Sequence, residues 1–229
     1  MVDLVRAGVA PVAAAKAARS AAEPAPTFGG MGPALAAADR LDAAELLAIR
    51  TAHLAHFGVV STWNRLRRPV FADIVDRHTG ESGLIEVEHV PSWAVTTALH
   101  RAVPTIRYTT GRAPVLLACT AGENHVLPLE VLRAALTEAD IPALLLGAAL
   151  PAGALAAAIA RQPREPAVTL WSQTERTAAP APIPPGCRTP ARLLLAGPDR
   201  PGSAAFPGAR RVDSLEDALG DIVRSVHMI

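Results

Sequence analysis

Three consecutive residues, Glu123, Asn124 and His125, could take part in binding a metal ion. They follow an apolar run at residues 115–119 and precede a helical pattern that opens at Leu127. Imidazole is the commonest protein ligand of transition metals, and a ligating histidine usually donates its other ring N–H to a carboxylate. Glu123 is two residues away and is placed to accept that hydrogen bond. The pattern therefore predicts a metal centre that is served by His125 and supported by Glu123.

Short apolar runs that alternate with helical segments place this motif in an α/β domain. Strands are predicted at 115–119, 143–146, 167–171 and 193–196, and helices at 127–139, 151–161 and 215–226, the last capped by Ser214. Strands that alternate with helices pair in parallel and form a doubly wound sheet, whose ligand crevice lies beyond the carboxyl ends of the strands. We therefore expect His125 at that crevice. The Pro-rich stretch 178–190 replaces a regular helix in one crossover.

Small residues follow the other predicted strands, namely Gly147, Ser172 and Gly197. They are expected to leave room for a bulky ligand beside His125. An exposed loop histidine without a special role is nevertheless the commoner outcome in proteins. Taken alone, the strand-end residues leave both interpretations open.

The preceding part of the chain is predicted to be helical. Asp42 is a plausible N-cap of a helix that ends at Gly58, and a second helix at 59–78 contains Pro69, which implies a kink or a break. A third helix at 84–102 completes a bundle with short connections. The predicted organisation is a remnant helix and linker (1–32), a four-helix-type bundle (33–105) and a Rossmann or flavodoxin-like α/β domain (112–229).

Composition excludes several classes of protein. The 229 residues carry 22 basic and 21 acidic side chains, a formal charge of +1, which argues against a nucleic-acid-binding surface. Two cysteines without a signal peptide favour a reducing, cytoplasmic compartment. Residues 143–160 have no polar side chain, but Gly147, Pro151 and Gly153 interrupt them, so we expect no membrane span.

Four segments, 122–125, 146–151, 170–173 and 196–198, occur in the order and at the spacing of a cobalamin-binding domain. More closely, the chain resembles the sensory half of the MerR-type cobalamin-dependent photoreceptor regulators, the CarH and LitR group. The resemblance implies that His125 is the lower axial ligand of cobalt and that Glu123 supports it. It also implies contacts from Ser172 and Gly197 to the nucleotide tail of the cofactor.

Two departures from the family's pattern narrow the expected tail groove. Pro128 stands where the histidine motif of the family usually has glycine, and Ala196 stands in place of the first of two paired glycines.

Segments 58–63 and 85–89 resemble the bundle that covers the upper face of the corrin in these photoreceptors. Glu88 and His89 match its Glu-His pair, which puts His78 where the family has tryptophan. His78 is then either a second axial ligand, a residue that makes room for a bilin such as biliverdin, or an ordinary helix-end residue near Gly80. Ile85, His89, Trp93 and Thr96 share one helix face, which predicts that His89 points inward.

The resulting hypothesis is a cytoplasmic light sensor, not an enzyme, that binds adenosylcobalamin base-off and in one version also binds biliverdin. Only residues 4–15 resemble the DNA-binding domain of the family, so output would pass through a partner or an oligomer rather than through DNA. The expected cofactor-binding residues are Glu123, Asn124, His125, Leu127, Gly147, Trp171, Ser172, Gly197, His78, Glu88, His89 and Trp93. The alternatives are a corrinoid subunit of a methyltransferase system and a degenerate, cofactor-free partner of a full-length regulator.

Overall fold

The computed structural model describes residues 30–77, 85–103, 114–178, 183, 186–198 and 208–227. The chain divides into two compact units, 1–104 and 105–229, each with a core of its own. The predicted N-terminal helix, the linker before Gly30 and residue His78 lie outside the described residues.

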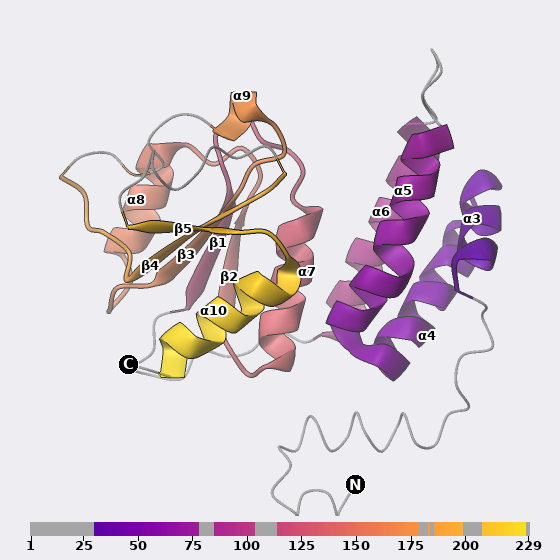
Figure 1. Ribbon diagram of the computed structural model, residues 1–229, viewed down its shortest axis with the longest axis horizontal. Helices are drawn as coiled ribbons and strands as arrows, with labels where there is room; N and C mark the ends of the chain where they lie inside the picture. The colour runs from indigo at the N-terminus through magenta and orange to yellow at the C-terminus, as the bar shows by residue number, and fades with distance from the viewer. Residues whose placement is uncertain are drawn as a thin grey trace, which may run out of the picture. The chain divides into compact units, whose positions relative to one another are not determined.

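The first unit is helical, as predicted. Its described elements are α3 (Met31–Asp39), α4 (Ala43–Thr62), the π-helical turn η1 (Trp63–Arg67), α5 (Arg68–Arg77) and α6 (Ile85–Ala102), whose α-helices are labelled in Figure 1. Asp42 caps α4 as expected, because its side chain accepts a hydrogen bond from the backbone N–H of Glu45 at 2.9 Å.

Helix α4 is interrupted at the glycine where the sequence predicts its end. Gly58 has φ 78° and ψ 178°, outside the helical region, but the helix resumes and continues to Thr62. The predicted disturbance near Pro69 takes the form of η1, a rare π-helical turn directly before α5. Pro69 itself is the second residue of α5, directly after η1, and without an N–H it cannot continue the hydrogen-bond ladder of the preceding turn.

The core of the helical unit collects apolar side chains from all these helices. It contains Ala34, Ala37, Ala38, Leu46, Ile49, Leu66, Val70, Ile74, Val87 and Ala94, all fully or almost fully buried. The alanines of α3 allow its backbone to approach the neighbouring helices closely.

The second unit is a doubly wound α/β domain, as predicted. Its strands are β1 (Val115–Cys119), β2 (Ala143–Gly147), β3 (Ala167–Trp171), β4 (Arg192–Ala196) and β5 (Ala209–Val212), and its helices are α7 (Leu127–Glu138), α8 (Ala152–Ala160), α9 (Glu175–Ala178) and α10 (Leu215–His227). The strands are parallel and ordered β2-β1-β3-β4-β5. Strand β5 and helix α9 are absent from the sequence prediction.

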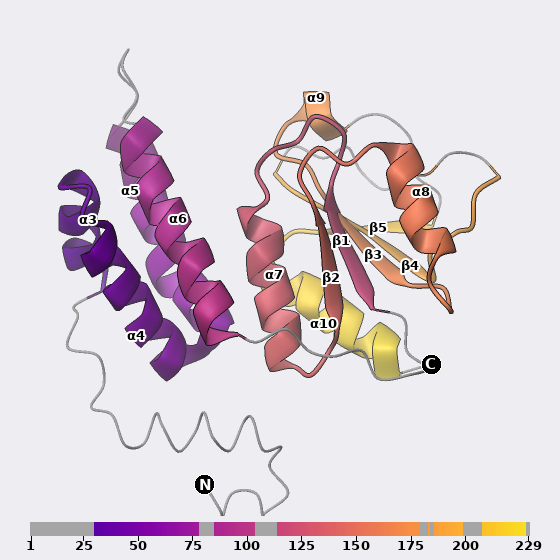
Figure 2. The ribbon, with the colours of Figure 1, turned by 180° about the vertical axis from the view of Figure 1, so that it is seen from behind.

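Helices cover both faces of the sheet, as Figures 1 and 2 show: Figure 1 looks at the face with α7 and α10, and Figure 2 brings α8 forward. Side chains of β1 alternate between these layers. Val115, Leu117 and Cys119 pack with α7 and α10, whereas Leu116 and Ala118 pack with α8. Residues 143–160 form β2, a connection and α8, and no helix in the described ranges is long and apolar enough to cross a membrane.

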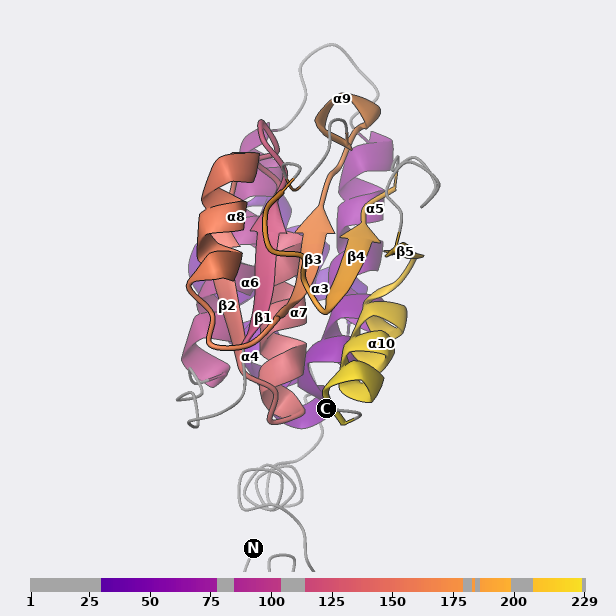
Figure 3. The ribbon, with the colours of Figure 1, turned by 90° about the vertical axis from the view of Figure 1, so that its left-hand side faces the viewer.

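The strand order creates a switch point at β1. After β1 the chain moves outward to β2, and it then returns to β3 on the other side of β1. The loops that follow β1 and β3 therefore flank the switch point at the carboxyl edge of the sheet, which is where doubly wound domains bind ligands. Figure 3 shows the arrowhead of β3 directed toward this edge, where α9 lies.

Asp221 joins the last helix to the sheet. This carboxylate of α10 is 3% exposed and accepts hydrogen bonds from Arg192 Nε at 2.8 Å and from Arg210 Nη1 at 2.7 Å. Burial by itself would raise the pKa of Asp221, but the hydrogen bond and charge of Arg192, with the charges of Arg210 and Arg224, hold it below its ordinary value. The residue thus stays ionised and binds β4 and β5 to α10.

Replacing Asp221 with Asn should lower the free energy of unfolding by about 2 kcal/mol at pH 7, chiefly because the guanidinium groups of Arg192 and Arg210 lose a charged acceptor. Both are about a third exposed, so the loss is smaller than for a fully buried pair. The control Asp213→Asn removes an exposed ion pair and should change stability by less than about 0.5 kcal/mol. Urea unfolding measures both variants, and equal losses would contradict the prediction.

The difference in the free energy of unfolding between wild type and D221N should depend on pH. Because folding lowers the pKa of Asp221, its contribution is fully present above about pH 4 and is lost as the pH falls through the folded-state pKa. The difference between wild type and D221N should close in that acidic range.

Candidate functional site

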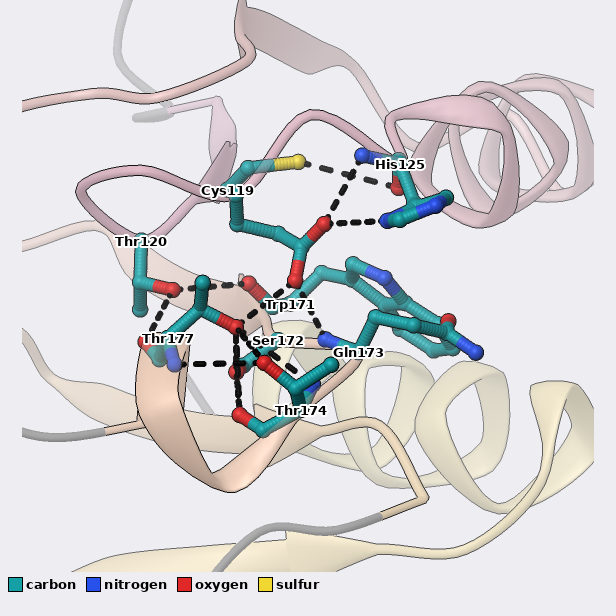
Figure 4. A network of polar contacts seen from close by, with 9 residues as sticks. Cys119, Thr120, His125, Trp171, Ser172, Gln173, Thr174 and Thr177 are labelled. Atoms are coloured by element: carbon teal, nitrogen blue, oxygen red, sulfur yellow. Dashed lines mark hydrogen bonds and ion pairs between the residues drawn. The ribbon is translucent and has the colours of Figure 1, made fainter.

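Glu123 is a buried carboxylate in the loop that follows β1. It is only 2% exposed, and each of its oxygens accepts two hydrogen bonds (Figure 4). Oε1 accepts from the backbone N–H of His125 at 2.9 Å and lies 2.6 Å from His125 Nδ1. Oε2 accepts from the backbone N–H of Gln173 at 2.6 Å and from Thr177 Oγ1 at 2.8 Å. The carboxylate is therefore completely satisfied by donors from the loops after β1 and β3 and from α9.

These donors keep Glu123 ionised. Burial alone would raise its pKa, but the backbone N–H groups of His125 and Gln173, the Thr177 hydroxyl and the His125 ring lower it to about 2. A carboxylate in such a site is an acceptor only, so the hydrogen bond with the imidazole must be donated by Nδ1–H.

The orientation of His125 follows from this hydrogen bond. With the ring proton on Nδ1, a neutral imidazole carries its lone pair on Nε2, which is the nitrogen free to ligate a metal. The side chain of His125 is 61% exposed, whereas that of Glu123 is buried beneath it. The structure thus confirms the predicted pairing of Glu123 with His125 and presents a basic nitrogen at the carboxyl edge of the sheet.

A network of hydroxyl groups extends this arrangement into α9. Thr177 bonds to Glu123, its hydroxyl lies 2.8 Å from Ser172 Oγ, and its carbonyl accepts from Thr120 Oγ1 at 2.6 Å. Figure 4 shows these side chains gathered around the carboxylate. The sequence prediction does not include Thr177 or Thr120. The one available signal is Thr174, three residues before Thr177, in the position of a helix N-cap.

The expected contact between Ser172 and a ligand stays a prediction. Ser172 is completely buried, and its hydroxyl donates to the carbonyl of Thr174 at 2.9 Å. Its side chain therefore holds the loop after β3.

Gly197 is expected from the sequence to leave room for a ligand, whereas the structure shows a close backbone contact there. A Cβ built on this residue, whose φ is +125°, would lie 1.8 Å from the carbonyl oxygen of Ser172. The glycine thus permits the loops after β3 and β4 to touch. At Gly147 nothing lies within 4 Å of a built Cβ, which agrees with the expected open space at this strand end.

The remaining predicted residues of this unit have different surroundings. Asn124 is exposed beside His125, whereas Leu127 is 9% exposed at the start of α7. Trp171 ends β3 and packs against the core, and its indole Nε1 is buried without a hydrogen-bond partner in the described part of the chain.

The predicted orientation of His89 is wrong. His89 and Glu88 are exposed, and Trp93 is 50% exposed. The buried stripe of α6 consists instead of Val87, Pro91, Ala94, Val95, Ala98 and Leu99, which recur at helical spacing. Small alanines give this stripe a weak sequence signal. Contact of Glu88, His89 or Trp93 with a cofactor stays a prediction.

Comparison with known proteins gives a likeness of fold. No protein-family profile matches the sequence, and no curated protein matches it. The fold is similar to a chain in the crystal structure of the methanol:cobalamin methyltransferase complex MtaBC from Methanosarcina barkeri, with a TM-score of 0.45 and 14% sequence identity over 89% of this chain and 82% of that chain. At this level the likeness leaves the activity open.

Replacing Glu123 with Gln should change the tautomer of His125. The wild-type ring is expected to carry its proton on Nδ1, and loss of the charged acceptor should shift it toward the Nε2–H form. Nitrogen NMR of the histidine ring measures this population. Glu130→Gln, at another buried glutamate of the same unit, should leave the ring unchanged. A wild-type ring that is mainly Nε2–H would contradict the assignment.

Replacing Gly197 with Ala should destabilise the α/β unit far more than replacing Gly147 with Ala. Both glycines have positive φ, so both variants lose roughly 1–2 kcal/mol to backbone strain. Only at Gly197 does the added methyl also overlap a backbone carbonyl. Denaturant unfolding should show at least twice the loss for G197A, and similar losses would argue against the close contact of the two loops.

Proposed function

We propose that the α/β unit binds a cobalamin in its base-off form, with Nε2 of His125 as the lower axial ligand of cobalt. The observation that carries this proposal is the hydrogen bond from His125 Nδ1 to the buried, ionised Glu123. It fixes the tautomer that a metal requires and increases the basicity of the outward nitrogen.

The residues present fit such a group. A metal that is already chelated by a macrocycle needs a single axial ligand from the protein on one side, and His125 is one exposed imidazole. The open surroundings of Gly147 supply space at the neighbouring strand end. Bound adenosylcobalamin would supply a cobalt–carbon bond that visible light can break.

Each residue of the site has a separate task in this proposal. His125 would hold the cofactor through Nε2, and Glu123 would orient the ring and stabilise positive charge on it. Thr177 and the backbone of Gln173 keep Glu123 ionised, so they act on the metal site through the carboxylate. Because Glu123 is 2% exposed, water does not compete for its hydrogen bonds.

We also propose that the protein responds to light. Support comes from the resemblance of the Glu88–His89 segment to the cap of cobalamin photoreceptors and from the exposure of both side chains, which leaves them available to a ligand or a partner. A signal would pass through a change in a partner or self-association surface.

Reconstitution with adenosylcobalamin tests the cofactor proposal. After removal of free cofactor, the wild-type protein should keep a red-coloured complex with the spectrum of histidine-ligated cobalamin. His125→Ala should lose that spectrum, and Glu123→Gln should weaken binding by roughly 10–100-fold. His100→Ala, at an exposed histidine of α6, is the matched control and should bind normally. Equal binding by wild type and H125A would contradict axial ligation.

Green light applied to the reconstituted protein tests the proposed light response. A changed spectrum with a changed elution volume in size-exclusion chromatography supports a photosensor, and a parallel sample with biliverdin tests bilin binding. An unchanged spectrum and elution volume would contradict light sensing and would support cobalamin binding alone. Transfer of a methyl group from bound methylcobalamin to a thiol would favour the corrinoid-subunit alternative.

A further inference from the structure

Arg50 is a buried guanidinium group without a counter-charge. It lies on the buried face of α4, one turn from Leu46 and from His53, and is 1% exposed. Its Nε, Nη1 and Nη2 atoms are all buried and have no hydrogen-bond partner in the described ranges. Burial lowers its pKa to about 10, so the group remains charged at neutral pH.

Arg67 is a second cation of the same unit. Its guanidinium lies 3.5 Å from the ring centroid of Phe71 and 4.6 Å from that of Trp63, and its Nε is buried without a partner in the part of the chain that the structure describes. Burial and the charge of Arg50 lower its pKa to about 9, against the opposing charge of Glu88. The charge of Arg50 therefore disfavours the charged form of Arg67.

The backbone between the two arginines is unusual as well. Gly58 departs from helical geometry and η1 inserts a π-helical turn that ends at Arg67. Such turns occur frequently at functional sites. Arg67 is only partly buried, whereas Arg50 is enclosed, so the pair extends from the surface toward the interior of the helical unit.

Two like charges in this position are unfavourable in the isolated protein. A buried charge is normally paired, because removal from water is expensive. Among the described residues, neither Arg50 nor Arg67 forms an ion pair with an acidic side chain. The aromatic rings beside Arg67 offset part of its desolvation, whereas the nitrogen atoms of Arg50 have no hydrogen-bond partner among the described residues.

We propose that Arg50 and Arg67 form a binding site, within the helical unit, for an oxyanion group of a small molecule. Arginine presents its N–H groups in a planar fork that suits both carboxylate and phosphate oxygens. The bound anion supplies the missing acceptors of Arg50 and removes the repulsion between the two cations. This site is separate from His125 and goes beyond the cobalamin proposal.

Thermal unfolding of the full-length protein without cobalamin tests the site. In a Trp171→Phe background the remaining tryptophans, Trp63 and Trp93, report on the helical unit alone. Inorganic phosphate and acetate, compared with chloride at equal ionic strength, distinguish the two kinds of oxyanion. At least one should raise the melting temperature by roughly 3–6 °C.

Arg50→Met should abolish this rise and should also melt higher than its parent in chloride, because it removes an unpaired buried charge. Arg65→Met, at an exposed arginine of η1, is the matched control and should keep the rise. The anion effect should also survive in His125→Ala, which separates this proposal from the cobalt site.

A rise that persists in Arg50→Met would be a general salt effect and would overturn the proposal. So would the lack of any rise in the parent protein. If Arg50→Met does not fold, Arg67→Met takes its place. Titration calorimetry of the wild-type protein with phosphate and with acetate is then the deciding measurement. The lack of any binding heat at millimolar anion concentrations would exclude the site.

Discussion

One buried negative charge organises the edge of the sheet where His125 lies. Glu123 receives four donors, and its own backbone carbonyl accepts a further hydrogen bond from Ala149 N at 2.7 Å, in the connection after β2. Three strand-end segments that are far apart in the sequence therefore meet at one residue. Four converging donors without an anion would repel one another, so the position demands charge as well as shape.

The strands and the metal-binding pair could be predicted because their signals are local. Val115–Cys119 and Ala167–Trp171 are short apolar runs, and they match the observed strands in full. Glu123 and His125 are two positions apart in the sequence, so their contact needs no knowledge of the tertiary fold. Strand β5, with the sequence Ala-Arg-Arg-Val, carries no apolar run, since Arg210 serves the carboxylate of Asp221.

Other features depend on contacts that a single sequence does not reveal. Helix α9 has four residues, too few to show the repeat of apolar residues by which a helix is predicted. The hydrogen bond of Thr177 to Glu123 depends on the tertiary contact between the loops after β1 and β3. The close approach of Gly197 to Ser172 is likewise a long-range contact. On α6, the inward face is marked by alanines and a proline, and the larger side chains His89 and Trp93 suggested the opposite face.

The two units differ in whether their buried charged side chains have hydrogen-bond partners among the described residues. In the α/β unit, Glu123 and Asp221 are each surrounded by donors from several elements. In the helical unit, Arg50 is as well buried as either carboxylate but has no acceptor among the described residues. A charge that is satisfied locally stiffens its surroundings, whereas one that lacks an acceptor raises the energy of the unit until a counter-charge arrives.

The π-helical turn η1 also constrains the length of the chain. Successive residues of an α-helix are about 100° apart around the axis, so gain of a further residue in this turn would rotate all of α5 by about that angle. Val70 and Ile74 would then leave the core, and their places would pass to polar neighbours such as Asp73. Relatives of this protein should therefore vary in residue type across Trp63–Arg67 far more readily than they gain a residue there.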